Sequence, residues 1–220
     1  MAFVLDNFCT VSGLKINLEK SKLVVSKGVP SARLEHLEQT LGIEHTPRFK
    51  RYLGIPMIKG KAKISDLHHV IDRINDHLAA WKGRLLNKAG RLCPINSVVT
   101  SIPLYNMQSL WFPQAVCNKI NQASRTMLLA KAGSSRYWSL VGWNTITRPK
   151  EFGGLGIRES RQVNISLIGK LIWDLLHSPQ KPWVKIQQAK YLHGESVLHA
   201  KKSNGASQVW NSIVKALPFL

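Results

Sequence analysis

Apolar residues recur every three or four positions along much of this 220-residue chain, which predicts amphipathic helices. The clearest example begins near residue 65, and its apolar face consists of Leu67, Val70, Ile71, Ile74, Leu78 and Trp81. Similar spacing predicts further helices over residues 1–12, 31–41, 87–102, 113–127, 161–176, 183–191 and 207–220. We therefore expect a mostly helical chain whose apolar stripes form the core.

Residues that favour helix ends flank several of these segments. Ser31, Ser65, Asn87 and Ser207 can each accept a hydrogen bond from a free N–H group in the first turn of a helix. Gly42 can adopt the left-handed conformation that commonly ends a helix. The sequence therefore predicts where these helices begin and end.

Two short segments have the composition of strands. Residues 23–26 include a pair of valines, and residues 48–57 carry Tyr52 and Leu53 before the break at Gly54. The expected fold class is α+β, mostly α, with a small β-hairpin element towards the N-terminal end of the chain.

Pro94 conflicts with the helix predicted over residues 87–102. A proline inside a regular helix removes one backbone hydrogen bond and clashes with the preceding turn, at a cost of about 3 kcal/mol. The sequence leaves three possibilities open: the helix bends, it begins later, or this copy of the sequence is damaged.

Charge is distributed unevenly along the chain. The net charge is +19, and no Asp or Glu occurs from His77 to Lys150. The basic residues of this window are Lys82, Arg84, Lys88, Arg91, Lys119, Arg125, Lys131, Arg136, Arg148 and Lys150. A long segment of one sign predicts a surface that binds a polyanion, and nucleic acid is the favoured partner. The alternative is a surplus of surface lysine without a ligand.

Several other classes of protein are disfavoured. No apolar run approaches the ~20 residues of a membrane-spanning helix, and the N-terminal segment carries Asp6 without the basic start of a signal peptide. Three widely spaced cysteines suit neither a disulfide framework nor a zinc knuckle. We therefore expect an intracellular protein, nuclear or cytoplasmic and not secreted, with no membrane partner and no metal site.

A glycine cluster, Gly153-Gly154-Leu155-Gly156, follows Pro149. It lacks the spacing and the preceding strand of a dinucleotide-binding loop. We therefore interpret the cluster as a turn whose backbone conformation requires glycine.

A set of spaced motifs carries a resemblance to a known family. The motifs are Ser12-Gly13-Leu14-Lys15-Ile16-Asn17, Lys20-Ser21-Lys22, Tyr52-Leu53-Gly54-Ile55-Pro56, Trp81-Lys82, Ala89-Gly90-Arg91, Ser101-Ile102-Pro103, the run from Pro149 to Arg158, Asn164 and Lys190-Tyr191. In this order they resemble the reverse transcriptases of plant LINE-type (non-LTR) retrotransposons. Proteins of this kind are often named putative ribonuclease H proteins or reverse transcriptase domain proteins.

The resemblance implies a division of the chain into three parts. Residues 1–60 would be the end of a polymerase palm with a primer-grip-like hairpin, residues 61–135 a helical thumb-like region, and residues 136–220 a helical connector. The fingers and most of the palm would precede residue 1, and the zinc-binding and ribonuclease H segments would follow residue 220.

The same resemblance raises the question of catalysis. In that family two adjacent aspartates help to hold the polymerase metals, whereas no two of the twelve acidic residues of this chain are adjacent. Two-metal phosphoryl transfer needs clustered carboxylates. We therefore expect this RNA-directed DNA polymerase fragment to be inactive alone and to hold no cofactor, with Mg²⁺ bound by the intact polymerase only.

The resemblance also implies which residues contact nucleic acid. Lys20 falls where polymerases place a lysine near the incoming triphosphate, which makes it a weak candidate general acid, and Lys22 belongs to the same block. Tyr52, Leu53 and Gly54 would hold a primer terminus. A solvated lysine and an ordinary pair of strands are the respective alternatives.

A second nominated group surrounds a predicted helix start and consists of Lys82, Arg84, Lys88 and Arg91. Basic side chains together with the free N–H groups of a helix start suit phosphate. We expect this group to contact the backbone of an RNA or DNA template–primer duplex. The sequence is compatible with a remnant of a reverse transcriptase and with a basic helical module for nucleic-acid binding or assembly that has no role in polymerisation.

Overall fold

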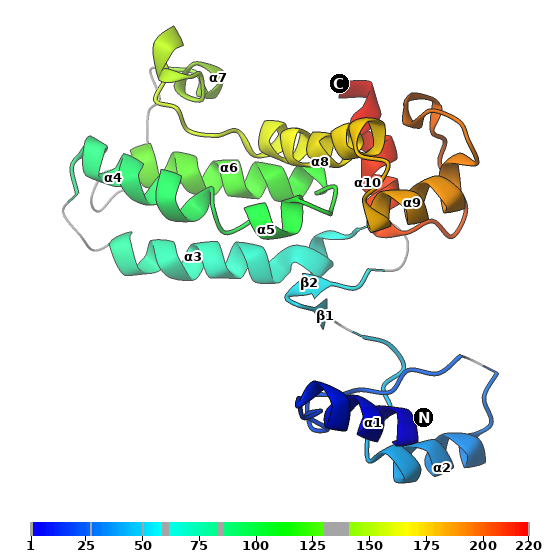
Figure 1. Cartoon of the computed structure of the whole chain (residues 1–220). Coiled ribbons are helices and arrows are strands. Elements are labelled where there is room, and N and C mark those ends of the chain that lie inside the picture. Colours follow the sequence, from blue (N-terminus) through cyan, green and yellow to red (C-terminus); the bar gives the residue numbers. More distant parts are fainter. Residues whose placement is uncertain are drawn as a thin grey trace. The chain divides into compact units, whose positions relative to one another are not determined.

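The computed structural model describes residues 2–26, 28–49, 51–58, 62–82, 86–129 and 141–219 (Figure 1). The helices in these ranges are α1 (Ala2–Ser12), α2 (Ser31–Leu41), α3 (His68–Lys82), α4 (Lys88–Pro94), α5 (Leu104–Met107), α6 (Gln114–Leu129), α7 (Trp143–Ile146), α8 (Ser160–His177), α9 (Pro182–Gln187) and α10 (Gln208–Ala216). One two-stranded sheet joins β1 (Arg51–Tyr52) to β2 (Ile55–Pro56). The expected α+β, mostly α fold class with a small N-terminal hairpin is confirmed.

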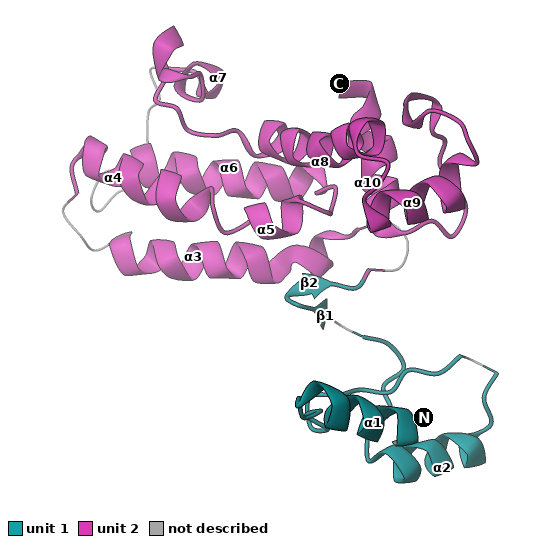
Figure 2. Ribbon diagram, in the orientation of Figure 1, with its two compact units in different colours: residues 1–57 teal, residues 58–220 magenta. Residues whose placement is uncertain are grey.

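The chain divides into two compact units, residues 1–57 and residues 58–220 (Figure 2). The first unit contains α1, α2 and the hairpin. Its apolar side chains are poorly covered: Leu41 at the end of α2 is buried, but Phe3, Phe8 and Val11 on α1 are exposed. The predicted helix over residues 1–12 is therefore confirmed, although its apolar face does not form a core.

The hairpin is very short. Arg51 pairs with Pro56 and Tyr52 with Ile55 in antiparallel register. Leu53 and Gly54 connect the strands, with φ angles of 48° and 83°. Positive φ at both central residues is the signature of the tight type I′ turn, whose twist matches that of paired strands.

The strand predicted over residues 23–26 is wrong. Leu23 forms an isolated parallel bridge with His45, donating its N–H to the Glu44 carbonyl at 3.0 Å and accepting from Thr46 N at 2.8 Å. Two adjacent β-branched residues favour an extended backbone, but a β-strand also needs a second strand that pairs with it along its length. This segment finds a partner at one residue only.

In the second unit, α6 packs against α3 and α4 and also against α8. A helix that contacts neighbours on more than one side must bury apolar residues on more than one face. In α6 the buried residues are Val116, Cys117, Ile120, Ser124, Met127 and Leu128. Burial raises the pKa of the Cys117 thiol to about 11, so this thiol is neutral at physiological pH and packs as a small apolar group.

The stripe predicted for the helix near residue 65 is confirmed as core at four of its six positions. Leu67, Val70, Ile74 and Leu78 are each no more than 4% exposed, whereas Ile71 and Trp81 are half-buried. The predicted cap is wrong, because the segment opens with a 3₁₀ turn over Ile64–Leu67. There the Asp66 carboxylate accepts a hydrogen bond from Lys63 N at 2.8 Å, in place of Ser65.

Of the other predicted helix ends, three are confirmed and one is wrong. Asn87 accepts a hydrogen bond from Gly90 N at 2.7 Å, and Ser207 accepts one from Trp210 N at 3.2 Å, so both caps are confirmed. Gly42 ends α2 with a φ of 64°, as expected. Ser31 is not a cap, because it is the first residue of α2 and no side-chain hydrogen bond caps that helix.

Pro94 does not delay the start of the helix, and helical structure of another type continues beyond it. It is the last residue of α4, and a π-helical turn over Ile95–Val99 continues directly from it. Thr100 N then donates to the Ile95 carbonyl at 3.0 Å. Since Pro94 has no N–H, the regular α-helical hydrogen bond of that residue is lost, and the wider turn follows where the α pattern is interrupted.

Helices α8, α9 and α10 surround a second apolar core. Its fully buried centre is Trp210, which stacks on Tyr191 with ring centroids 4.5 Å apart. Around this pair lie Ile168, Ile172, Leu175, Val184, Leu192, Val197, Ile213 and Ala216. The helices predicted over residues 161–176, 183–191 and 207–220 therefore fold onto one another, with π and 3₁₀ turns at the ends of the last two.

One buried polar side chain links this core to the segment after α5. Asn164 of α8 is fully buried, and its Oδ1 accepts from Phe112 N at 2.9 Å. Its Nδ2 donates to the carbonyl oxygens of Met107 at 3.0 Å and Leu110 at 2.8 Å. One amide thus satisfies the carbonyl of the last residue of α5 and two backbone groups beyond the helix, which fixes the path of residues 107–112 along α8.

We expect Asn164→Ala to destabilise the second unit by about 2–4 kcal/mol, because it leaves buried backbone groups without partners. All seven tryptophans lie between residues 81 and 210, so tryptophan fluorescence during urea unfolding reports on this unit alone. The matched control is Asn75→Ala, at an exposed position of α3. Equal unfolding midpoints for the two variants would contradict the assigned role of Asn164.

Candidate nucleic-acid interface

The nominated lysines of the first unit are exposed, but their surroundings differ. Lys20 lies in a turn, where its backbone N–H donates to Asn17 Oδ1 at 3.0 Å. Lys22 Nζ forms an ion pair with the Glu44 carboxylate. The hydrogen bond from Lys22, together with its charge, lowers the pKa of Glu44. A phosphate at Lys22 would therefore compete with a carboxylate, whereas Lys20 has no ion pair among the described residues.

Tyr52, Leu53 and Gly54 form the tip of the hairpin. The Tyr52 and Leu53 side chains are 68% and 74% exposed, and the turn brings the backbone of Gly54 to the surface. An exposed aromatic ring beside an open glycine is a suitable surface for a sugar or a base.

The second nominated group is only partly described. Lys88 and Arg91 lie on α4, three residues apart on one face, and Lys88 is exposed. Lys82 ends α3 with its side chain outside the described part, and Arg84 lies outside the described residues altogether. Arg91 is half-buried and its Nε donates to the Leu86 carbonyl at 3.0 Å, so this arginine also holds the entry to α4.

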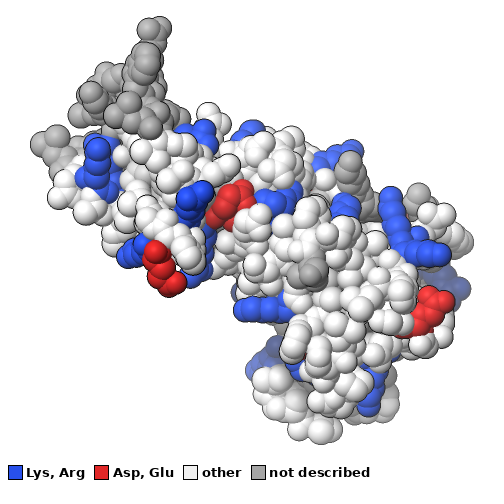
Figure 3. All heavy atoms as spheres, turned by 90° about the horizontal axis from the view of Figure 1, so that it is seen from above, with Lys and Arg blue, Asp and Glu red and all other residues white. Residues whose placement is uncertain are grey.

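On the face shown in Figure 3, Lys and Arg side chains outnumber Asp and Glu side chains. The basic side chains lie in separate groups and not in one continuous stripe. The positive charge of this face is therefore concentrated in several separate groups, and nucleic-acid binding by each group requires its own test.

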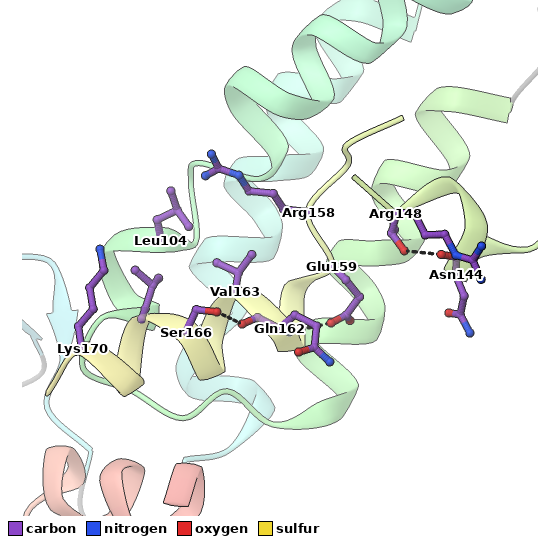
Figure 4. A pocket seen from close by; sticks show the side chains of 11 residues that line it. Leu104, Asn144, Arg148, Arg158, Glu159, Gln162, Val163, Ser166 and Lys170 are labelled. Carbon is purple, nitrogen blue, oxygen red and sulfur yellow. Dashed lines mark hydrogen bonds between the residues drawn. The ribbon is translucent and has the colours of Figure 1, made fainter. Parts of the chain in front are cut away.

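A cleft of about 870 Å³ lies beside the first half of α8 (Figure 4). Its lining residues are Leu104, Asn144, Thr147, Arg148, Arg158, Glu159, Gln162, Val163, Ser166, Leu167 and Lys170. Three of these are cations and one is an acid. Arg148, Arg158 and Lys170 form no ion pair with any described residue.

The one acid of the cleft is engaged in holding α8. Glu159 Oε2 accepts from Gln162 N at 2.7 Å, which caps the helix, and its Oε1 accepts from Asn121 Nδ2 at 2.7 Å. Asn121 Oδ1 in turn accepts from the hydroxyl of Ser160 at 2.7 Å. The carboxylate is thus used to join α6 to α8, and the cleft as a whole is basic.

The glycine cluster shapes this cleft, which confirms its interpretation as a turn. Gly156 N donates to the Arg148 carbonyl at 3.1 Å, so residues 148 and 156 lie side by side. At Gly154 a Cβ atom would lie 2.0 Å from the Arg148 carbonyl oxygen. The chain therefore folds tightly back on itself, and Arg148 and Arg158 come to line one cleft.

Arg148 belongs to the acid-free window, whereas the sequence pattern predicts no binding role for Arg158 or Lys170. These two residues stand in different segments, one in the glycine-rich motif and one inside a helix. The sequence signal was the turn itself, since a tight turn brings the residues before and after it together.

The described residues hold no group of three or more His, Cys, Asp or Glu side chains placed to bind a metal ion. Among the helices of the described ranges, none is both long enough and apolar enough to cross a bilayer.

We expect Gly154→Ala to destabilise the second unit by about 2–3 kcal/mol, because the added methyl group would overlap the Arg148 carbonyl. Gly153→Ala is the matched comparison, since Gly153 has a φ of 76° but a methyl group added there would meet no atom within 4 Å. Gly153→Ala should lower the free energy of unfolding by about 1 kcal/mol, which is the strain of an alanine in the left-handed conformation. Urea unfolding followed by tryptophan fluorescence tests this order, and the reverse order would refute the close approach.

Two plant proteins show similarity to this chain. Over 141 residues, 64% of the chain, it is 30% identical to an Arabidopsis thaliana protein named as a putative ribonuclease H protein, of which it spans 23%. Over 115 residues, 52% of the chain, it is 24% identical to an uncharacterised mitochondrial protein of Arabidopsis thaliana, of which it spans 75%. No family model and no solved structure matches the chain. The chain is thus similar to about a quarter of a larger plant protein named for ribonuclease H.

Proposed function

We propose that this chain is part of a retrotransposon-derived reverse transcriptase and binds template–primer nucleic acid through a basic helical surface. The observation that carries the proposal is the acid-free window from His77 to Lys150, with its ten basic residues. A surface of one sign attracts a polyanion at long range and releases counterions on binding. The motifs resembling LINE-type reverse transcriptases and the similarity to a protein named for ribonuclease H support a nucleic-acid ligand.

The proposed contact surface on the second unit consists of Lys82, Arg84, Lys88 and Arg91, which we call the α4 surface. Basic side chains on either side of a helix start can bind phosphates, because the positive end of the helix dipole adds to their field. Such contacts position a duplex without reading its sequence. In the first unit, Lys20 and Lys22 are proposed nucleic-acid contacts, with Lys20 near the position of the incoming triphosphate, and the hairpin tip at residues 52–54 is the proposed contact to the primer end.

In this proposal residues 1–60 correspond to the end of a palm, residues 61–135 to a thumb-like region and residues 136–220 to a connector. The chain by itself would not polymerise DNA, because its acids are dispersed along the sequence. A primer-extension assay with template, primer, nucleotides and Mg²⁺ tests this. Turnover by the purified chain would refute the catalytic part of the proposal and leave the binding part to be judged separately.

A basic helical module for nucleic-acid binding or assembly, with no polymerase role, is the second candidate. The two cores of residues 58–220 favour it, since they form within a unit that is separate from the proposed palm segment. Comparing a recessed primer terminus with a blunt duplex of equal length distinguishes the two. Preference for the terminus favours the reverse transcriptase, and equal affinity favours the module.

We expect the triple variant Lys82→Glu, Arg84→Glu, Lys88→Glu to bind duplex at least about ten-fold more weakly and to lower the salt slope of log K by roughly 2–3. Arg91 is left in place because its hydrogen bond to Leu86 supports α4. Fluorescence anisotropy across a salt titration measures both quantities.

The matched control for this variant reverses the same amount of charge outside the acid-free window. Lys185, Lys201 and Lys202 are exposed residues of the second unit, and the triple Glu variant should retain most of the affinity. If the two triple variants lost affinity equally, binding would depend on net charge, and the α4 surface would have no special role.

A further inference from the structure

The cleft beside α8 continues into an exposed stripe along the same helix. Gln162, Ser166, Lys170, Trp173 and His177 follow one another at steps of three or four residues, which places them on one helical face. Figure 4 shows the first three along the cleft side of α8. The stripe therefore runs from basic groups at the cleft to an aromatic ring one turn beyond Lys170.

Trp173 is unusually open for its size. Its side chain is 63% exposed, whereas Trp210, the centre of the nearby core, is fully buried. The His177 ring stacks on Trp173 with centroids 3.8 Å apart and an interplanar angle of 20°. His177 Nδ1 lies 3.1 Å from the Trp173 carbonyl oxygen, so the histidine is held against the indole. The indole is thus supported on one side and exposed to solvent.

The acid in the cap of α8 and the acid on α8 beside Trp173 both have partners, and in the cleft the single carboxylate is outnumbered by three cations. Glu159 caps the helix and bonds to Asn121. Asp174, next to Trp173 in sequence, forms an ion pair with Lys181 at 2.8 Å. The cations of the cleft, in contrast, form no ion pair with a described residue. The stripe therefore offers positive charge that is not neutralised within the described part of the chain.

We infer that this stripe and the adjoining cleft together bind single-stranded nucleic acid, with backbone phosphates at Arg148 and Arg158 of the cleft and at Lys170, and an unpaired base stacked on Trp173. Side chains three apart on a helix have Cβ atoms about 5–6 Å apart, so one nucleotide can contact both Lys170 and Trp173. Stacking requires a base that is not enclosed in a duplex. The inference shares its ligand class with the proposed function but concerns a different helix and a different form of the ligand.

Anisotropy with labelled twelve-nucleotide single strands of DNA and RNA, and with a twelve-base-pair duplex, tests the inference on the full chain. Trp173→Ala should weaken single-strand binding by about ten-fold and leave duplex binding unchanged, because base–aromatic stacking acts on the unpaired base. Trp173→Phe should restore part of the loss. Ile186→Ala is the control, because Ile186 is also 63% exposed and lies on another helix.

The phosphate contacts have a separate measurement. Arg158→Glu with Lys170→Glu should lower the salt slope for single strands by roughly 1.4, the value for two phosphate contacts. Lys201→Glu with Lys202→Glu carries the same charge change and should leave the slope nearly unaltered. Tryptophan fluorescence of each variant during urea unfolding verifies that the second unit remains folded.

The inference would be overturned if Trp173→Ala left the single-strand affinity unaltered, or if it lowered the affinities for single strand and duplex equally. Displacement of the single strand by micromolar nucleoside triphosphate would also overturn it, because it would indicate a nucleotide site. The triple variant of the α4 surface separates the two proposals. If the triple variant loses duplex binding while Trp173→Ala still weakens single-strand binding, both sites are supported. If the triple variant loses duplex binding but Trp173→Ala leaves single-strand binding unaltered, the single-strand site alone is refuted.

Discussion

The buried amide of Asn164 is a central contact where the two cores of the second unit are joined. It binds backbone groups of residues 107, 110 and 112, which lie at the end of α5 and in the non-helical chain that follows it. Arg161 strengthens the same junction from the edge of the helix, because it donates to the Phe112 carbonyl at 2.7 Å and lies over the Trp111 ring at 4.4 Å. Buried polar networks of this kind specify one arrangement, since any slip leaves several groups unpaired at once. The position of α8, and with it the cleft, depends on this junction.

Periodicity was sufficient to predict most of the helices, because their stability comes from one apolar face and that face is visible in the sequence. Local capping was predictable where one residue decides it, as at Asn87 and Ser207. It was not predictable near residue 65, where a 3₁₀ turn moves the helix start and Asp66 replaces the serine. The strand at residues 23–26 failed for the opposite reason, since pairing depends on a distant partner.

The candidate sites show the same division between local and distant information. The acid-free window and the glycine turn could be recognised in the sequence, because each is a property of neighbouring residues. The role of Asn164 could not, since its partners lie more than fifty positions earlier in the chain. Arg158 and Lys170 join Arg148 only after the chain has turned at Gly154 and entered α8. The sequence also does not reveal that Arg91 has a structural role, in which its Nε donates a hydrogen bond to the Leu86 carbonyl.

The scarcity of internal carboxylate partners has a thermodynamic consequence. The chain carries 31 basic but 12 acidic residues, an excess of 19 positive charges that Asp and Glu cannot balance. Most of the positive charge is therefore compensated by mobile counterions from solution, and like charges repel one another in the folded state. A polyanion that replaced those counterions would relieve this repulsion, and it would stabilise the fold to the extent that it bound the folded chain more tightly than the unfolded one. Under the proposed function, ligand binding and folding stability would therefore be coupled through the net charge of the chain.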